Sequence, residues 1–156
     1  MASRFRVLLV SIALALCLLA LMLVTLTPSP VDQPFAQLLE RVISELHERG
    51  LPQFIGYNKI EFGANILMFV PIGFLTTLLV PSRFAWTAII ISPLLSSALE
   101  GAQLVFLPAR YASVLDIVAN STGGFIGAAI AALLRIAVNH RDRLLLEDIR
   151  AGRRKA

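Results

Sequence analysis

Four long runs of apolar residues leave this chain little choice of fold. The first run, Val7 to Leu26, holds 20 residues and no charged side chain. At about 1.5 Å of rise per residue, a helix of that length matches the roughly 30 Å hydrocarbon layer of a bilayer. A cleaved signal peptide has an apolar core of only about 7–15 residues. The run therefore predicts an uncleaved transmembrane helix.

Three more apolar segments follow, at about 62–80, 84–107 and 114–138. The connections between them are very short, and short connections place neighbouring helices antiparallel. Composition agrees with a membrane protein, because hydrophobic residues make up 57% of the 156 residues and charged residues 15%. Soluble domains average about 45–50% and 25%. We predict an all-α integral membrane bundle of four transmembrane helices plus one amphipathic interfacial helix.

The interfacial helix is predicted between the first two transmembrane helices. Apolar residues recur there at offsets of three and four, which is one face of a helix: Phe35, Leu38, Leu39, Val42, Ile43 and Leu46. Asp32 and Pro34 suit its start, and Gly50 and Pro52 suit its stop. The segment is too short and too polar to cross a bilayer, so we expect it on the membrane surface or capping the bundle.

The chain divides into an anchor helix (1–28), an extracytoplasmic segment (29–60), a three-helix core (61–138) and a basic tail (139–156). Lys and Arg favour the cytoplasmic side of a membrane. With the N-terminus inside, that side carries nine of them: Arg4, Arg6, Arg83, Arg141, Arg143, Arg150, Arg153, Arg154 and Lys155. The outer side carries four: Arg41, Arg49, Lys59 and Arg110. Both termini are therefore predicted in the cytoplasm.

The net charge of +4 follows from this bias. No basic patch interleaved with aromatic residues exists, so we expect no nucleic-acid partner. The basic tail could contact anionic lipid headgroups. The single cysteine, Cys17, lies in the first apolar run. We interpret it as a small apolar side chain that faces lipid.

Polar residues inside the predicted spans are the main candidates for function, because a charge there costs about 2.5–3.5 kcal/mol on insertion scales. They are Glu61, Asn65, Glu100, Gln103, Asp116 and Asn120, with Arg110 in the loop before the last span. All seven fall in the predicted outer half of the membrane. We predict that they form one ligand-binding site that opens outward.

Within each helix these residues share one face. Glu61 and Asn65 are four apart, and Glu100 and Gln103 are three apart. In the last span the stripe is Asp116, Asn120, Gly123 and Gly127, and its two glycines are predicted to serve helix packing. Two alternatives remain open: the amides could only form hydrogen bonds between helices, and Glu100 could only pair with Arg110.

The charges of the predicted site do not balance. Three carboxylates, on Glu61, Glu100 and Asp116, face one close cation, Arg110. Buried like charges cannot all ionise cheaply, so either one carboxyl is protonated or a cation is bound. Oxygen ligands would favour a hard divalent cation such as Mg²⁺ or Ca²⁺. We assign no metal-binding residues, and no cysteine or histidine is placed to hold zinc.

Three blocks of sequence carry a family resemblance. They are the run from Asn65 to Phe74, which includes Pro71 and Gly73, then Glu100-x-x-Gln103, then Arg110 with the stripe from Asp116 to Gly127. Together they resemble the VanZ-like family over about 61–134. Ser121 stands where threonine is expected. The resemblance implies a bacterial plasma-membrane protein, Gly73 in a packing role, and a family whose namesake is an accessory factor for resistance to the glycopeptide teicoplanin.

Three functions are compatible with these features. The first is binding or modification of an envelope component, such as a membrane lipid or a lipid-linked precursor, at an outward-facing site. The second is proton- or cation-coupled transport with Glu100 as the carrier, although the candidate residues stop in the outer half. The third is a membrane enzyme with Glu100 or Asp116 as general base, for which no nucleophile motif is found. An oligomer is compatible with all three.

Overall fold

The computed structural model describes residues 2–26, 36–107 and 113–153, and these residues are mostly helical. Four helices are long and apolar enough to cross a membrane: α1 (Ala2–Thr25), α3 (Tyr57–Leu79), α4 (Thr87–Phe106) and α5 (Val114–Arg153). The shorter α2 (Ala36–Glu48) precedes α3, and a 3-10 turn, η2 (Ser82–Phe84), precedes α4. The predicted all-α membrane bundle is confirmed.

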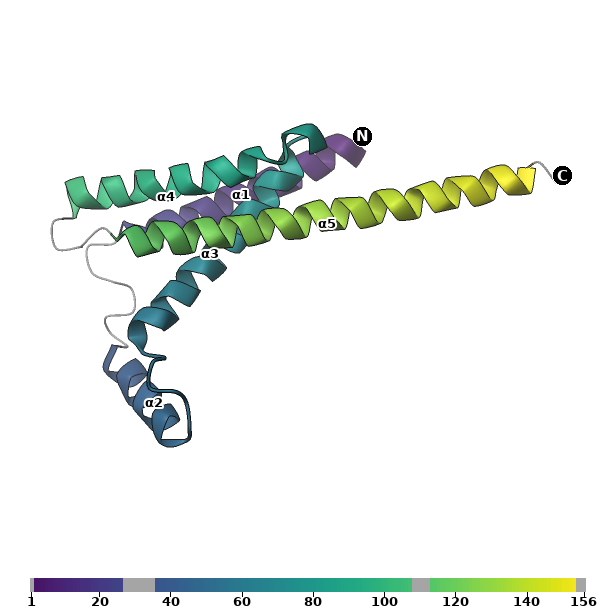
Figure 1. The fold of residues 1–156 in the computed structure, drawn as a ribbon. Helices are drawn as coiled ribbons and strands as arrows, with labels where there is room; N and C mark the ends of the chain where they lie inside the picture. The colour runs from purple at the N-terminus through teal and green to yellow at the C-terminus, as the bar shows by residue number, and fades with distance from the viewer. Residues whose placement is uncertain (1, 27–35, 108–112, 154–156) are drawn as a thin grey trace.

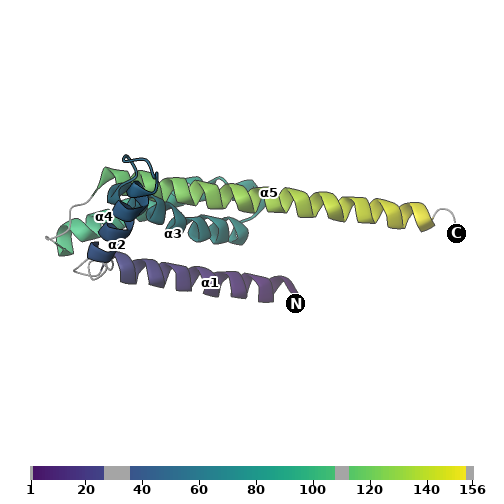
Figure 2. The same cartoon turned by 90° about the horizontal axis from the view of Figure 1, so that it is seen from below.

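The pair α3 and α5 forms the centre of the bundle, with α4 packed on α5 and α1 packed on α3. In Figures 1 and 2, α1, α4 and α5 run roughly parallel to one another, while α3 crosses them at a slant. The first turns of α3 lean away from the other helices, and α5 continues well past the bundle at its other end.

Glycines allow the central pair to approach closely. A Cβ atom at Gly123 would collide with the backbone oxygen of Ile66, and one at Gly127 with that of Val70. From the other side, a Cβ at Gly73 would collide with the backbone of Gly124. All three predicted packing glycines therefore lie where α3 and α5 touch, as small residues do at membrane helix interfaces.

The apolar core is small, as expected where lipid replaces water around the bundle. Phe69 and Ile72 of α3 are almost fully buried, together with Leu21 of α1 and Leu99 of α4. The prediction that Cys17 faces lipid was wrong. Cys17 is partly buried and packs on this core, because it lies on the same stripe of α1 as Leu21.

The predicted interfacial helix is present as α2, and it ends where the sequence indicated. Gly50 has a φ of 103°, and the amides of Gly50 and Leu51 donate to the carbonyls of His47 and Leu46. This is the Schellman arrangement, in which glycine tolerates the left-handed backbone. Figure 1 shows α2 beside the bundle rather than over its end, which favours the surface placement. The predicted start, Asp32 to Phe35, lies outside the described residues.

The helix boundaries differ most from the predicted spans in α3 and α5. α3 begins at Tyr57 rather than near residue 62. α5 does not stop near Val138 but continues as one helix of 40 residues to Arg153. Neither glycine nor proline occurs from 128 to 151, so nothing in the sequence breaks the helix there. Loss of hydrophobicity marks where a helix leaves the membrane, not where it ends.

Candidate functional site

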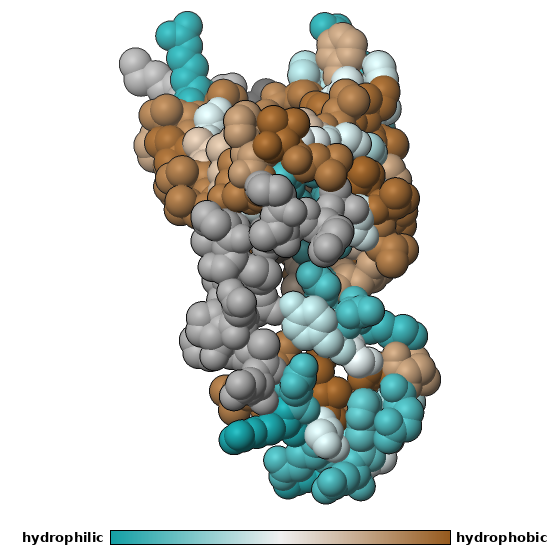
Figure 3. Space-filling model, turned by 90° about the vertical axis from the view of Figure 1, so that its left-hand side faces the viewer, coloured by the Kyte–Doolittle hydropathy of each residue, from teal (hydrophilic) through white to brown (hydrophobic). Residues whose placement is uncertain are grey.

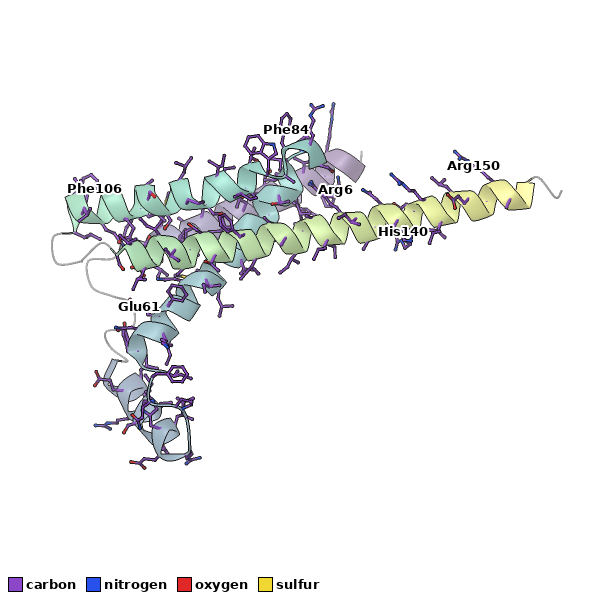
Figure 4. All side chains as sticks on the ribbon, viewed as in Figure 1. Arg6, Glu61, Phe84, Phe106, His140 and Arg150 are labelled. Atoms are coloured by element: carbon purple, nitrogen blue, oxygen red, sulfur yellow. The ribbon has the colours of Figure 1, made fainter. Side chains whose placement is uncertain are left out.

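Polar side chains from α3, α4 and α5 gather at one end of the bundle. It is the end at which α1 and α4 finish and α5 begins, with Phe106 of α4 at its edge (Figure 4). Seen from this end, hydrophilic atoms show between the hydrophobic surfaces of the helices (Figure 3). We refer to the following residues as the outer polar cluster, after the side of the membrane that the sequence predicts for this end: Asn65, Ser96, Glu100, Gln103, Ser113, Asp116 and Asn120.

Asn65 and Asp116 join the two central helices. The Nδ2 of Asn65 donates a hydrogen bond to the Oδ1 of Asp116 at 2.8 Å. The two side chains are separated by 51 positions in sequence, and only the slanted crossing of α3 over α5 brings them together. The close contacts of Gly123 with Ile66 and of Gly127 with Val70 lie further along the same two helices.

Glu100 contacts the start of α5. Its Oε2 accepts a hydrogen bond of 2.9 Å from the backbone N–H of Ser113, and Glu100 is 8% exposed. Ser113 is itself the N-cap, because its Oγ accepts from the N–H of Leu115 at 3.2 Å. A carboxylate is stabilised at this position, where the helix dipole leaves partial positive charge.

The two remaining amides also link helices. Gln103 donates to the backbone oxygen of Thr25 at 2.8 Å, which satisfies a carbonyl in the last turn of α1. Asn120 donates to the Oγ of Ser96 at 2.9 Å, between α5 and α4. Asn120 is 6% exposed, and its Oδ1 is buried without a hydrogen-bond partner among the described residues. That oxygen is a hydrogen-bond acceptor left unused inside the bundle.

Glu61 and Arg110 are not part of this described cluster. Glu61 is exposed on the first turns of α3, where that helix leans away from the bundle (Figure 4). Arg110 lies outside the described residues, so its pairing with Glu100 stays a prediction. In the ranges that the structure describes, no three Asp, Glu, His or Cys residues converge as a metal site requires. His47 lies on α2, where its Nε2 contacts the oxygen of Ile55 at 3.0 Å.

Three polar groups deeper in the bundle were not predicted from the sequence: Thr77, Ser92 and Arg135. Ser92 and Thr77 are 1% and 0% exposed, and Thr77 Oγ1 has no described hydrogen-bond partner. Arg135 of α5 donates to the backbone oxygens of Leu78 and Val80, at 2.9 and 2.8 Å. The statement that candidate polar residues stop in the outer half was therefore wrong for the bundle as a whole.

A simple signal would have found Arg135. The stripe of Asn120, Gly123 and Gly127 advances by three and four residues, and two further steps of four reach Ala131 and Arg135. Ala131 is fully buried, so the stripe continues to the far end of the bundle. Thr77 and Ser92 carry no comparable signal, because small hydroxyl residues occur on every face of membrane helices.

Comparison with known proteins gives one match. The family model described as VanZ/LLP1 matches residues 12–135, which include most of α1, all of α2, α3 and α4, and α5 as far as Arg135. The match extends beyond the three blocks that carry the sequence resemblance. No curated protein and no solved structure matches the chain.

Proposed function

The chain belongs to the VanZ-like family, and from this we propose that it binds or modifies a cell-envelope component at the outer face of a bacterial plasma membrane. The proposed ligand is the polar part of a membrane lipid or of a lipid-linked envelope precursor. Altered susceptibility to glycopeptides such as teicoplanin, which bind cell-wall precursors, would be one consequence.

The observation that carries this proposal is the unused acceptor in the outer polar cluster. A buried polar atom without a partner costs free energy unless something binds it, and Asn120 Oδ1 is such an atom. Carboxylates on Glu100 and Asp116 lie on the neighbouring turns of α4 and α5. A cluster rich in acceptors suits a ligand rich in donors, such as sugar hydroxyls or an amine.

Proton- or cation-coupled transport is the second candidate, and one observation favours it. Buried polar atoms without described partners occur towards both ends of the bundle: on Asn120 in the outer polar cluster, and on Thr77 and Arg135 at the opposite end. Bound water at these positions could connect the two ends of the bundle. Proton uptake into proteoliposomes that follows an imposed potential, and that is lost in Thr77→Val, would support transport over binding.

The test of the binding proposal uses Glu100→Gln, with Glu48→Gln on the exposed face of α2 as the matched control. Glutamine keeps the shape and an oxygen that can accept from Ser113, so protein level and insertion should stay near those of the wild type. Cells that express the wild type should differ from cells without the protein in their envelope lipids or teicoplanin susceptibility. Glu100→Gln should abolish that difference and Glu48→Gln should preserve it. Full activity of Glu100→Gln at normal expression would refute the proposed site.

A further inference from the structure

A cavity of about 580 Å³ lies at the opposite end of the bundle, between α1, the end of α3 and α5. Its polar lining comes from Arg6, Ser82, Arg135 and Asn139, and apolar side chains such as Val7 and Leu134 form much of the rest. Figure 4 shows Arg6 on α1 at the same end of the bundle as Phe84, which ends η2 before α4. The cavity is separate from the outer polar cluster.

Arg135 is the deepest charged group at this cavity. Its Nη2 donates to the carbonyls of Leu78 and Val80 and so completes the C-terminal end of α3. Its Nη1 is buried and has no hydrogen-bond partner among the described residues. The Arg135 guanidinium therefore has an N–H donor without an acceptor, and Arg135 takes part in none of the described ion pairs. An anion in the cavity would supply both an acceptor and a compensating charge.

The described charged side chains that line the cavity are all positive. Among the described residues that line it, two are arginines and none is acidic. Arg4 and Arg83 add positive charge at the same end, on the first turn of α1 and on η2. Basic pockets between transmembrane helices are typical sites for anionic lipid headgroups. The volume also falls in the range of about 300–1,000 Å³ that is usual for ligand sites.

We propose that this cavity binds the phosphate of an anionic phospholipid. The arginines, Ser82 and Asn139 offer donors to the phosphate, while Val7, Leu134 and their apolar neighbours line the same cavity and suit the glycerol and upper acyl chain. A free phosphate ion would leave that apolar lining in contact with water, so the mixed lining favours a lipid. This site is independent of the proposed function at the outer end.

The test measures lipid retention by the purified full-length chain. Protein in a neutral detergent is titrated with phosphatidylglycerol or with phosphatidylcholine of the same acyl chains, and bound lipid is counted by native mass spectrometry. We expect a preference for phosphatidylglycerol in the wild type and a loss of about fivefold in its affinity in Arg6→Gln, since one surface arginine contributes roughly this much. Arg4→Gln is the matched control, because Arg4 lies two residues away and does not line the cavity.

A second variant, Asn139→Asp, keeps the proposal testable if Arg6→Gln fails to fold. Asn139→Asp adds a negative charge at the cavity on an exposed position of α5, and it should also lower phosphatidylglycerol affinity. Equal affinity for the two lipids would overturn the proposal, because the cavity would then not select a negative headgroup. Equal losses in Arg4→Gln and Arg6→Gln would overturn it in favour of diffuse attraction to the basic end of the bundle. Displacement of the lipid by millimolar inorganic phosphate would reassign the cavity to a free phosphate and overturn the lipid.

Discussion

Ser113 caps the start of α5 and Asp116 follows it by three residues, which is the spacing of a capping box. In that motif the acid accepts the N–H of the capping residue. Here Glu100 of α4 accepts it, and Asp116 accepts from Asn65 of α3. Glu100 therefore links α4 to the start of α5, and Asp116 links the start of α5 to α3. These hydrogen bonds explain how the bundle retains two carboxylates at this end.

The contact between Asn65 and Asp116 can be measured with a double-mutant cycle. Asn65→Ala and Asp116→Ala should each destabilise the protein, and the pair should show a coupling of about 0.6 kcal/mol, the average for hydrogen bonds between membrane helices. Unfolding in mixed micelles gives the free energies. Asn65→Ala combined with Gln103→Ala is the control, because Gln103 contacts Thr25 and not Asp116. The losses in unfolding free energy of these two variants should add. A coupling near zero for the first pair would contradict the contact.

The sequence predicted which residues of the outer polar cluster share a face, but not which atoms meet. The stripe Asp116, Asn120 follows from helical periodicity alone. Whether Asp116 contacts Asn65 or Glu100 depends on how far each helix is rotated and how α3 slants, and neither is encoded locally. The exposure of Glu61 was missed for the same reason, since the first turns of α3 lean out of the bundle.

The crossing of α3 and α5 depends on backbone contact, so it should tolerate no added methyl group. In Gly127→Ala the new Cβ would collide with the carbonyl of Val70. We expect a loss of about 1–3 kcal/mol in the free energy of unfolding, as for overpacking elsewhere. Gly101→Ala on α4 is the matched control, because nothing lies within 4 Å of its Cβ position. That variant should be neutral or slightly more stable, and equal losses in both variants would contradict the packing.

At the level of elements, the transmembrane helices and α2 could be predicted because hydropathy and period are local properties. The errors at the start of α3 and the end of α5 have one cause, because the limit of the apolar run was taken as the limit of the helix. Tyr57 to Glu61 and Asn139 to Arg153 are polar, yet each continues the helix beside it. Hydrogen bonding within a helix needs no membrane, so only glycine, proline or a cap would have marked these ends.

The two ends of the molecule differ in charge, and this difference bears on its orientation. One end carries the acids of the outer polar cluster. The other end carries Arg6, which is labelled in Figure 4, together with Arg83 and Arg135. Arg135 raises the predicted cytoplasmic count of Lys and Arg from nine to ten, against four on the other side. The helical extension of α5 places Arg141, Arg143 and Arg150 beyond the bundle at the basic end.

This asymmetry predicts that both termini lie in the cytoplasm, because positive charge near membrane spans is retained inside. Cys17 is the chain's single cysteine, so Cys17→Ala gives a background without thiols. On it, Glu48→Cys at the end of α2 should react with an impermeant thiol reagent in intact cells, whereas Arg150→Cys on the α5 extension should react only after the cells are permeabilised. Both positions are exposed, so access to the reagent depends on the side of the membrane and not on burial. Labelling of position 150 in intact cells would show that the orientation is the opposite one, with the outer polar cluster facing the cytoplasm.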